Sequence, residues 1–75
     1  MKPFRAYQLT TPSGETFTTV CLQRPGEELR ILSRDPKTHE WVPETRFGIA
    51  DLVMPQYDLN EWDVESINPN QYDFP

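Results

Sequence analysis

The chain lacks the features that mark secreted and membrane-spanning proteins. A single cysteine, Cys21, stands among its 75 residues, so no internal disulfide can staple the fold as in small secreted scaffolds. Residues 1–5 form no apolar signal core, and no apolar run approaches the roughly 18–20 residues that a membrane-spanning helix needs. We therefore expect a cytoplasmic protein with no membrane partner.

Residues that carry enzyme and metal chemistry are also scarce. His39 and Cys21 are the only residues of their kinds and lie far apart in the sequence, which is not the spacing of a zinc site. The carboxylates around Asp58 break the order of a calcium-binding loop, because no glycine follows them. No nucleophile elbow, phosphate-binding loop or metalloprotease motif occurs. We predict no cofactor, no metal and no catalytic residue, and therefore a protein that is not an enzyme.

The hydrophobic content is low, at 36%, and aromatic residues compensate for part of it. The four Phe, three Tyr and two Trp residues each bury about 150–250 Å² when packed. Eight prolines oppose long helices and favour turns. These proportions indicate one small folded domain with a thin core, since a chain of this length buries only about 60% of its unfolded surface.

Short segments rich in β-branched and aromatic residues alternate with turn residues. The clearest is residues 15–23, where Phe17, Thr19 and Cys21 share one face and apolar residues also occupy the other. Proline-containing turns occur near residues 12, 25 and 36. The fold class is therefore mainly β, a small, highly curved antiparallel sheet or SH3-like barrel of four to five strands. We predict these strands over residues 4–11, 15–23, 28–33, 39–42 and 62–67.

Two segments lack a clear strand pattern. Residues 44–54 match a helical stripe of apolar residues but contain a glycine, so we predict at most one short helix there, with a strand as the alternative. Residues 68–75 contain turn residues and no periodicity. We assign residues 1–67 to the single small domain and residues 68–75 to a C-terminal tail, which Tyr72 or Phe74 could pin to the domain.

Charge is divided unevenly along the chain. After Arg46 there are six carboxylates and no Lys, Arg or His, whereas residues 1–46 carry seven basic and six acidic side chains. On a strand, Glu61, Asp63 and Glu65 would project from one face at intervals of about 6.6 Å. Such a row resembles the phosphates of one nucleic-acid strand, which follow each other at about 3.4 Å along the axis. A simpler interpretation is that like charges on an edge strand prevent aggregation between edges.

We predict that this acidic segment docks on a basic partner. Its carboxylates would steer association, and Trp62 or Tyr57 would supply an apolar anchor. The predicted partner is a larger protein with a basic surface, such as a nucleic-acid-handling enzyme or complex, and no nucleic acid is bound directly. The predicted partner-binding residues are Asp51, Tyr57, Asp58, Glu61, Trp62, Asp63, Glu65 and Asp73.

In its length, acidity and single-domain form, the chain resembles the small acidic proteins that bacteriophages direct against host machinery. That class includes nucleic-acid mimics, anti-CRISPR proteins and modulators of host RNA polymerase. The resemblance rests on no particular residues, so it transfers no functional residue to this chain. It implies a non-catalytic inhibitor or modulator of a host protein, located in the cytoplasm of the host cell if the chain is viral.

Two other functions are compatible with the sequence. Small β-barrels bind single strands by stacking bases on aromatic residues in a basic groove, and Arg30, Arg34 and Arg46 could line such a groove. Carboxylates interspersed with these arginines bring the local charge near balance, which disfavours binding to phosphates. The other function is a structural or assembly subunit, and the sequence does not define the oligomeric state.

Overall fold

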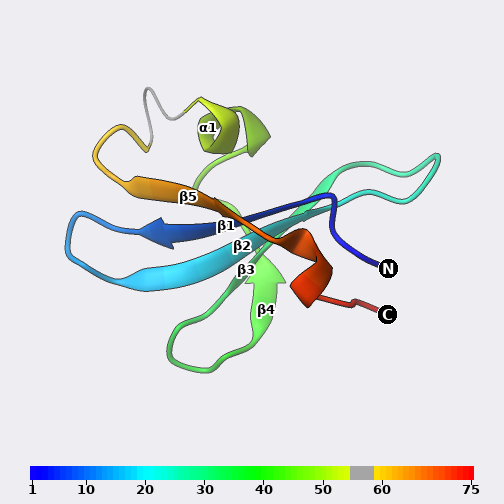
Figure 1. The fold of residues 1–75 in the computed structure, drawn as a ribbon, viewed down its shortest axis with the longest axis horizontal. Coiled ribbons are helices and arrows are strands. Elements are labelled where there is room, and N and C mark those ends of the chain that lie inside the picture. Colours follow the sequence, from blue (N-terminus) through cyan, green and yellow to red (C-terminus); the bar gives the residue numbers. More distant parts are fainter. Residues whose placement is uncertain (55–58) are drawn as a thin grey trace.

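The computed structural model describes residues 1–54 and 59–75, and its centre is a five-stranded antiparallel sheet (Figure 1). Across the sheet the strands follow the order β4-β3-β2-β1-β5, so the first four form a meander and β5 returns to pair with β1. The elements are β1 (Arg5–Thr10), β2 (Thr16–Leu22), β3 (Arg30–Arg34), β4 (Trp41–Pro43), α1 (Ile49–Val53), β5 (Asp63–Ile67) and the 3₁₀ turn η1 (Pro69–Gln71). The predicted mainly β fold is confirmed, and it takes the form of an open sheet with β4 and β5 at its edges.

The turns that the sequence predicts lie where the strands reverse. In the β1–β2 turn Gly14 has a φ of 91°, which a residue without Cβ adopts at little energetic cost. In the β3–β4 turn the Asp35 carboxylate accepts hydrogen bonds from the backbone N–H groups of Lys37 and Thr38, at 2.8 and 3.2 Å. His39 follows with a φ of 64°, which is uncommon for a residue that carries a side chain. These local bonds and angles define how β4 returns alongside β3.

The ambiguous segment at residues 44–54 contains helix α1, which begins after Gly48. The backbone N–H of Gly48 donates to Oδ2 of Asp51 at 2.9 Å and so caps the first turn. Leu52 is buried against the sheet, whereas Met54 at the end of the helix is exposed. The predicted short helix therefore forms in place of the strand alternative, but the predicted stripe is wrong, because Ala50, Val53 and Met54 are exposed and the helix buries Leu52 instead.

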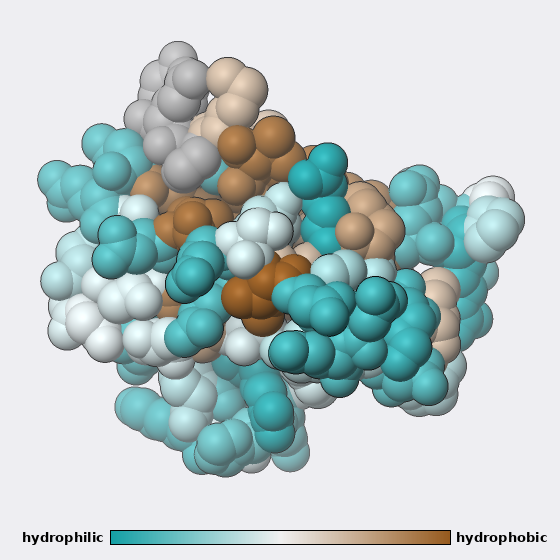
Figure 2. Space-filling view, in the orientation of Figure 1, coloured by the Kyte–Doolittle hydropathy of each residue, from teal (hydrophilic) through white to brown (hydrophobic). Residues whose placement is uncertain are grey.

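Both faces of the sheet carry an apolar cluster, because side chains alternate along each strand. The helix-face cluster, on the face that α1 covers, comprises Tyr7, Leu9, Phe17, Cys21, Phe47, Leu52 and Leu59. The opposite-face cluster comprises Ala6, Val20, Leu22 and Leu32. β2 contributes to both clusters, as its two half-apolar faces predict. Figure 2 shows apolar residues grouped near the middle of the viewed face, with hydrophilic residues around them.

The C-terminal segment packs on the sheet. The rings of Tyr72 and Phe74 contact Trp41 edge-on, with centroids 5.6 and 5.2 Å away. The backbone N–H of Phe74 donates to the carbonyl oxygen of Met1 at 2.9 Å, and the N-terminal ammonium of Met1 donates to the carbonyl oxygen of Phe74. Tyr72 and Phe74 therefore both hold the C-terminal segment against the sheet. The boundary between residues 67 and 68 stays a prediction.

Candidate functional site

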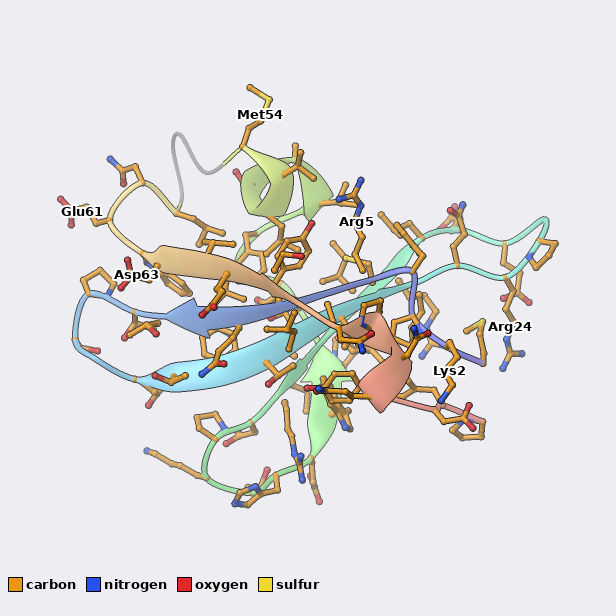
Figure 3. The ribbon with its side chains drawn as sticks, in the orientation of Figure 1. Lys2, Arg5, Arg24, Met54, Glu61 and Asp63 are labelled. Atoms are coloured by element: carbon orange, nitrogen blue, oxygen red, sulfur yellow. The ribbon has the colours of Figure 1, made fainter. Side chains whose placement is uncertain are left out.

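The predicted row of carboxylates lies at the β5 edge of the sheet, but part of it is outside the strand. β5 begins at Asp63, and Glu61 lies in the preceding turn, where the backbone N–H of Trp62 donates to the carbonyl oxygen of Leu59 at 3.1 Å. The sequence predicts that Glu61, Asp63 and Glu65 project from one face of the last strand. This prediction is wrong for Glu61, which lies before the strand begins. Figure 3 nevertheless shows Glu61 and Asp63 close together at one end of the molecule.

We call Glu61, Asp63 and Glu65 the acidic edge. All three side chains are exposed. Asp63 and Glu65 project from the face opposite α1, because Val64 between them packs against the helix-face cluster. Across the part of the chain that the structure describes, these three side chains make no ion pair and no hydrogen bond. Their charge is therefore available to a partner.

Two predicted site residues are used inside the fold. Asp51 caps α1, as described above. Asp73 pairs with the N-terminal ammonium of Met1 at 3.1 Å, and the hydrogen bond and charge of that ammonium lower the pKa of Asp73 from its ordinary value of 3.8. Lys2, beside this pair in the sequence, lies at the opposite end of the molecule from Glu61 and Asp63 (Figure 3). The structure thus brings three of the predicted carboxylates together and places Asp73 away from them.

Of the two predicted apolar anchors, the structure describes Trp62 and not Tyr57. Tyr57 lies outside the described residues, and so does the predicted carboxylate Asp58. Trp62 is half-buried, and its ring contacts Phe17 and Phe47 edge-on, with both centroid separations at 6.0 Å. Trp62 therefore packs in the helix-face cluster, and its part in docking stays a prediction.

A second group of charged side chains surrounds Glu44, one of the carboxylates interspersed with the arginines, whose burial the sequence does not predict. The side chain of Glu44 is only 2% exposed and accepts hydrogen bonds from Nε and Nη2 of Arg46, at 3.0 and 2.8 Å. The Ser33 hydroxyl donates to Oε1 of Glu44 at 2.5 Å, and Thr19 and Ser33 share a hydrogen bond of 2.7 Å. Burial alone would raise the pKa of Glu44, but the hydrogen bonds from Arg46 and Ser33 outweigh it and lower that pKa.

The guanidinium of Arg46 lies over aromatic rings of the helix-face cluster. Its Cζ atom is 4.6 Å from the ring centroid of Phe17 and 5.7 Å from that of Trp62, within the range of cation–π attraction. The sequence signal for the Glu44–Arg46 pair is only the spacing of two opposite charges by two residues. In an extended segment that spacing puts both side chains on one side of the chain. The pair is a structural feature, because every carboxylate oxygen has a partner.

Two of the three arginines of the alternative nucleic-acid site, Arg34 and Arg46, line one cleft, and Arg30 is not in its lining. A cleft of about 350 Å³ is lined by Arg34, Lys37 and Arg46 on its basic side, with Glu15 and Glu44 among its acidic lining. Arg30 is the first residue of β3 and Arg34 the last, so these two backbone positions are about 13 Å apart. Because Glu44 neutralises Arg46, the cleft is not a strongly positive groove.

Comparison of the chain with protein-family models, curated proteins and solved structures finds no match. Among residues 1–54 and 59–75, no group of three His, Cys, Asp or Glu side chains is arranged to hold a metal ion. No helix in that same part of the chain is both long and apolar enough to cross a membrane. The candidate site is therefore defined by geometry and charge alone.

Proposed function

We propose that the protein is a non-catalytic binding protein whose acidic edge docks on a basic surface of a larger nucleic-acid-handling protein and inhibits or modulates it. The observation that carries this proposal is the difference between the carboxylates. Glu44, Asp51 and Asp73 each have a hydrogen-bonding partner inside the fold, whereas Glu61, Asp63 and Glu65 lie together, exposed and unpaired within the described residues. Negative charge concentrated at one edge steers association with a positive surface.

The arrangement suits a surface that normally holds nucleic acid. Asp63 and Glu65 are two residues apart on β5, so their attachment points are separated by about 6.6 Å, or twice the phosphate repeat of one strand. A basic groove that binds phosphates can therefore meet these carboxylates at alternate positions. Carboxylates so close together repel each other, and a surface selected for solubility alone more naturally mixes charges of both signs.

The test is quantitative capture of partners from a nuclease-treated bacterial lysate at low and moderate salt. The parent chain is compared with a variant that carries Glu61→Gln, Asp63→Asn and Glu65→Gln, which keeps shape and removes charge. A matched control carries Glu27→Gln, Glu28→Gln and Glu40→Gln, three exposed carboxylates outside the acidic edge. We expect the acidic-edge variant to bind the captured protein about tenfold more weakly or worse, a loss of at least about 1.4 kcal/mol.

The control variant should bind as the parent does, because it loses the same number of negative charges as the acidic-edge variant but at positions outside the acidic edge. Binding by the parent should also weaken steeply as salt rises, since exposed charges are screened over about 10 Å at 0.1 M. If the acidic-edge variant binds as tightly as the parent, or if both variants lose affinity equally, the proposed docking site is wrong.

A direct nucleic-acid binder is the second candidate, and the cleft lined by Arg34, Lys37 and Arg46 favours it. A gel-shift assay with single- and double-stranded oligonucleotides separates the two functions. A shift that Arg34→Gln abolishes and the acidic-edge variant keeps would support the second candidate. A structural or assembly role is distinguished by sedimentation, in which it requires oligomers that form as concentration rises.

A further inference from the structure

The hydrogen-bonding pattern of the sheet shows which backbone groups of β5 face outward. In the β1–β2 pair, the N–H of Thr11 donates to the carbonyl oxygen of Glu15, which marks the odd-numbered residues of β1 as those bonded to β2. The even-numbered residues of β1 therefore bond to β5, and their partners there are Asp63, Glu65 and Ile67.

Val64 and Ser66 must then direct their backbone N–H and C=O groups away from β1, because the direction alternates along a strand. Within residues 1–54 and 59–75, β5 pairs with no strand other than β1, and no hydrogen bond to these outward groups is found. Ser66 is exposed and Val64 is half-buried, so the edge is open to solvent at Ser66. Figure 1 draws β5 as the outermost strand on this side of the sheet.

The β4 edge presents fewer outward backbone donors to an added strand. β4 has only three residues, and the N–H of Glu44 donates to the carbonyl oxygen of Ile31 at 2.8 Å, so Glu44 and Val42 face β3. The outward residues are then Trp41 and Pro43, and proline has no N–H to donate. A partner strand can therefore form a continuous ladder of hydrogen bonds only on β5.

We infer that the β5 edge binds an extended basic segment of the partner as a sixth strand. This inference rests on the proposed function and specifies how the acidic edge is used. The outward N–H and C=O groups of Val64 and Ser66 would supply the ladder, as in other cases of strand addition. Asp63 and Glu65 would face Lys or Arg side chains on the added strand, since opposite charges on neighbouring strands attract.

The chemistry of the occupant follows from the two faces of β5. Residues of the added strand beside Asp63 and Glu65 are basic, and those beside Val64 continue the helix-face cluster and are apolar or β-branched. The expected segment thus alternates Lys or Arg with Val, Ile or Thr. A second copy of this chain fits poorly, because pairing two β5 edges would bring their carboxylates against each other.

The experiment uses the full chain and a synthetic peptide of about nine residues in which lysine alternates with valine or threonine. Binding is measured by fluorescence anisotropy, and amide hydrogen exchange is followed by NMR. We expect the peptide to slow exchange of the Val64 and Ser66 amides at saturation. A peptide of equal composition with its lysines contiguous should bind about tenfold more weakly, because it keeps the charge and loses the alternation.

The deciding variant is Ser66→Pro, which removes an outward N–H and is tolerated at such a position of an edge strand. We expect it to lower affinity for the alternating peptide about tenfold, consistent with the loss of one or two net hydrogen bonds, while Ser66→Ala binds as the parent does. A second test leaves the protein unchanged and uses two peptides, one N-methylated at its odd-numbered residues and the other at its even-numbered residues. The peptide whose N-methyl groups face β5 should bind about tenfold more weakly, because it cannot donate to the ladder.

The outcomes separate the inference from the proposed function. If Ser66→Pro and both N-methylated peptides bind normally while the acidic-edge variant fails to bind, docking is by charge alone and strand addition is wrong. If the acidic-edge variant also binds normally, the acidic edge is not the docking site and both proposals fall. Slowed exchange at Val64 and Ser66 that grows with protein concentration, without peptide, would show that a second copy occupies the edge.

Discussion

The two edges of the sheet are protected in different ways. On the β4 edge, Pro43 withdraws a backbone donor, and the aromatic residues of the C-terminal segment pack against Trp41. On the β5 edge, Val64 and Ser66 direct both backbone groups outward, and the exposed carboxylates of Asp63 and Glu65 lie next to them along the strand. A missing N–H interrupts the hydrogen-bond ladder with any added strand, whereas negative charge repels only strands that are themselves negative.

Substitutions near the two edges are therefore expected to affect different properties, stability near β4 and binding near β5. Near β4, Glu44 is hydrogen-bonded to Arg46 and Ser33, and Trp41 packs against the C-terminal rings, so substitutions of these two residues should lower the free energy of unfolding. Side chains of the acidic edge are exposed and make no ion pair or hydrogen bond within the described residues, so substitutions there should leave stability nearly unchanged and alter association.

The largest effect is expected for Trp41→Ala. This substitution removes the ring that Tyr72 and Phe74 pack against, and large-to-small changes at packed aromatic sites lower the free energy of unfolding by about 3 kcal/mol. Urea denaturation followed by circular dichroism measures the change. Trp41→Phe is the control and should lose less than half as much. A midpoint for Trp41→Ala equal to that of the parent would show that the C-terminal segment does not stabilise the β4 edge.

A smaller loss is expected for Glu44→Gln. It removes the buried charge that Arg46 and Ser33 satisfy, and because Arg46 is half-exposed we expect about 1–2 kcal/mol, less than for a fully buried ion pair. Glu40→Gln, at an exposed carboxylate, is the control and should change stability little.

The Glu44 carboxylate also predicts a pH dependence. Its pKa in the folded protein is lowered from the ordinary value of 4.5, so its contribution is complete above that value and is lost as pH falls through the lowered pKa. Denaturation curves between neutral pH and pH 3 should therefore show the parent and Glu44→Gln converging at acid pH. Curves that stay equally far apart throughout would contradict the role of this ionised group.

A gain in stability of about 0.5 kcal/mol is expected for His39→Gly. The φ of 64° at this position strains a residue that carries a side chain, and glycine relieves the strain but has more conformational entropy to lose on folding. His39→Ala is the control, since it keeps the strain and should show no gain. Thermal unfolding measures both variants, and a stabilising effect of alanine as large as that of glycine would exclude relief of backbone strain.

The smallest change in stability, within about 0.5 kcal/mol, is expected for the variant with Glu61→Gln, Asp63→Asn and Glu65→Gln. Removing the repulsion between edges should instead promote self-association through β5, which sedimentation velocity detects. Adding Ser66→Pro to this variant should reverse the added self-association, because it interrupts the ladder. Self-association that persists with Ser66→Pro would show that the edges are not the contact.

Most of the sheet could be predicted from residue types and turn chemistry. β2 was predicted over residues 15–23 and spans Thr16–Leu22, because Phe17, Val20 and their β-branched neighbours fit a pleated surface packed on both faces. The turn at Asp35 was predictable for a similar reason, since its side-chain hydrogen bonds are made within the turn itself.

The features that escaped prediction depend on contacts between distant parts of the chain. The sequence groups Asp73 with the acidic segment because it follows Arg46, but the fold brings it to the ammonium of Met1. By sequence, Glu44 is one of the carboxylates interspersed with the arginines, and only the return of β4 alongside β3 places it against Ser33. The pairing of β5 with β1 likewise follows from no local signal.

The most direct measurement is competition between this protein and nucleic acid for the protein that it captures from the lysate. We expect the parent and the Glu27, Glu28 and Glu40 control variant to displace a labelled oligonucleotide from that partner, and the acidic-edge variant to displace it at about tenfold higher concentration or not at all. A ternary complex in which the partner holds both the oligonucleotide and the parent chain, or equal displacement by all three chains, would contradict the proposed function.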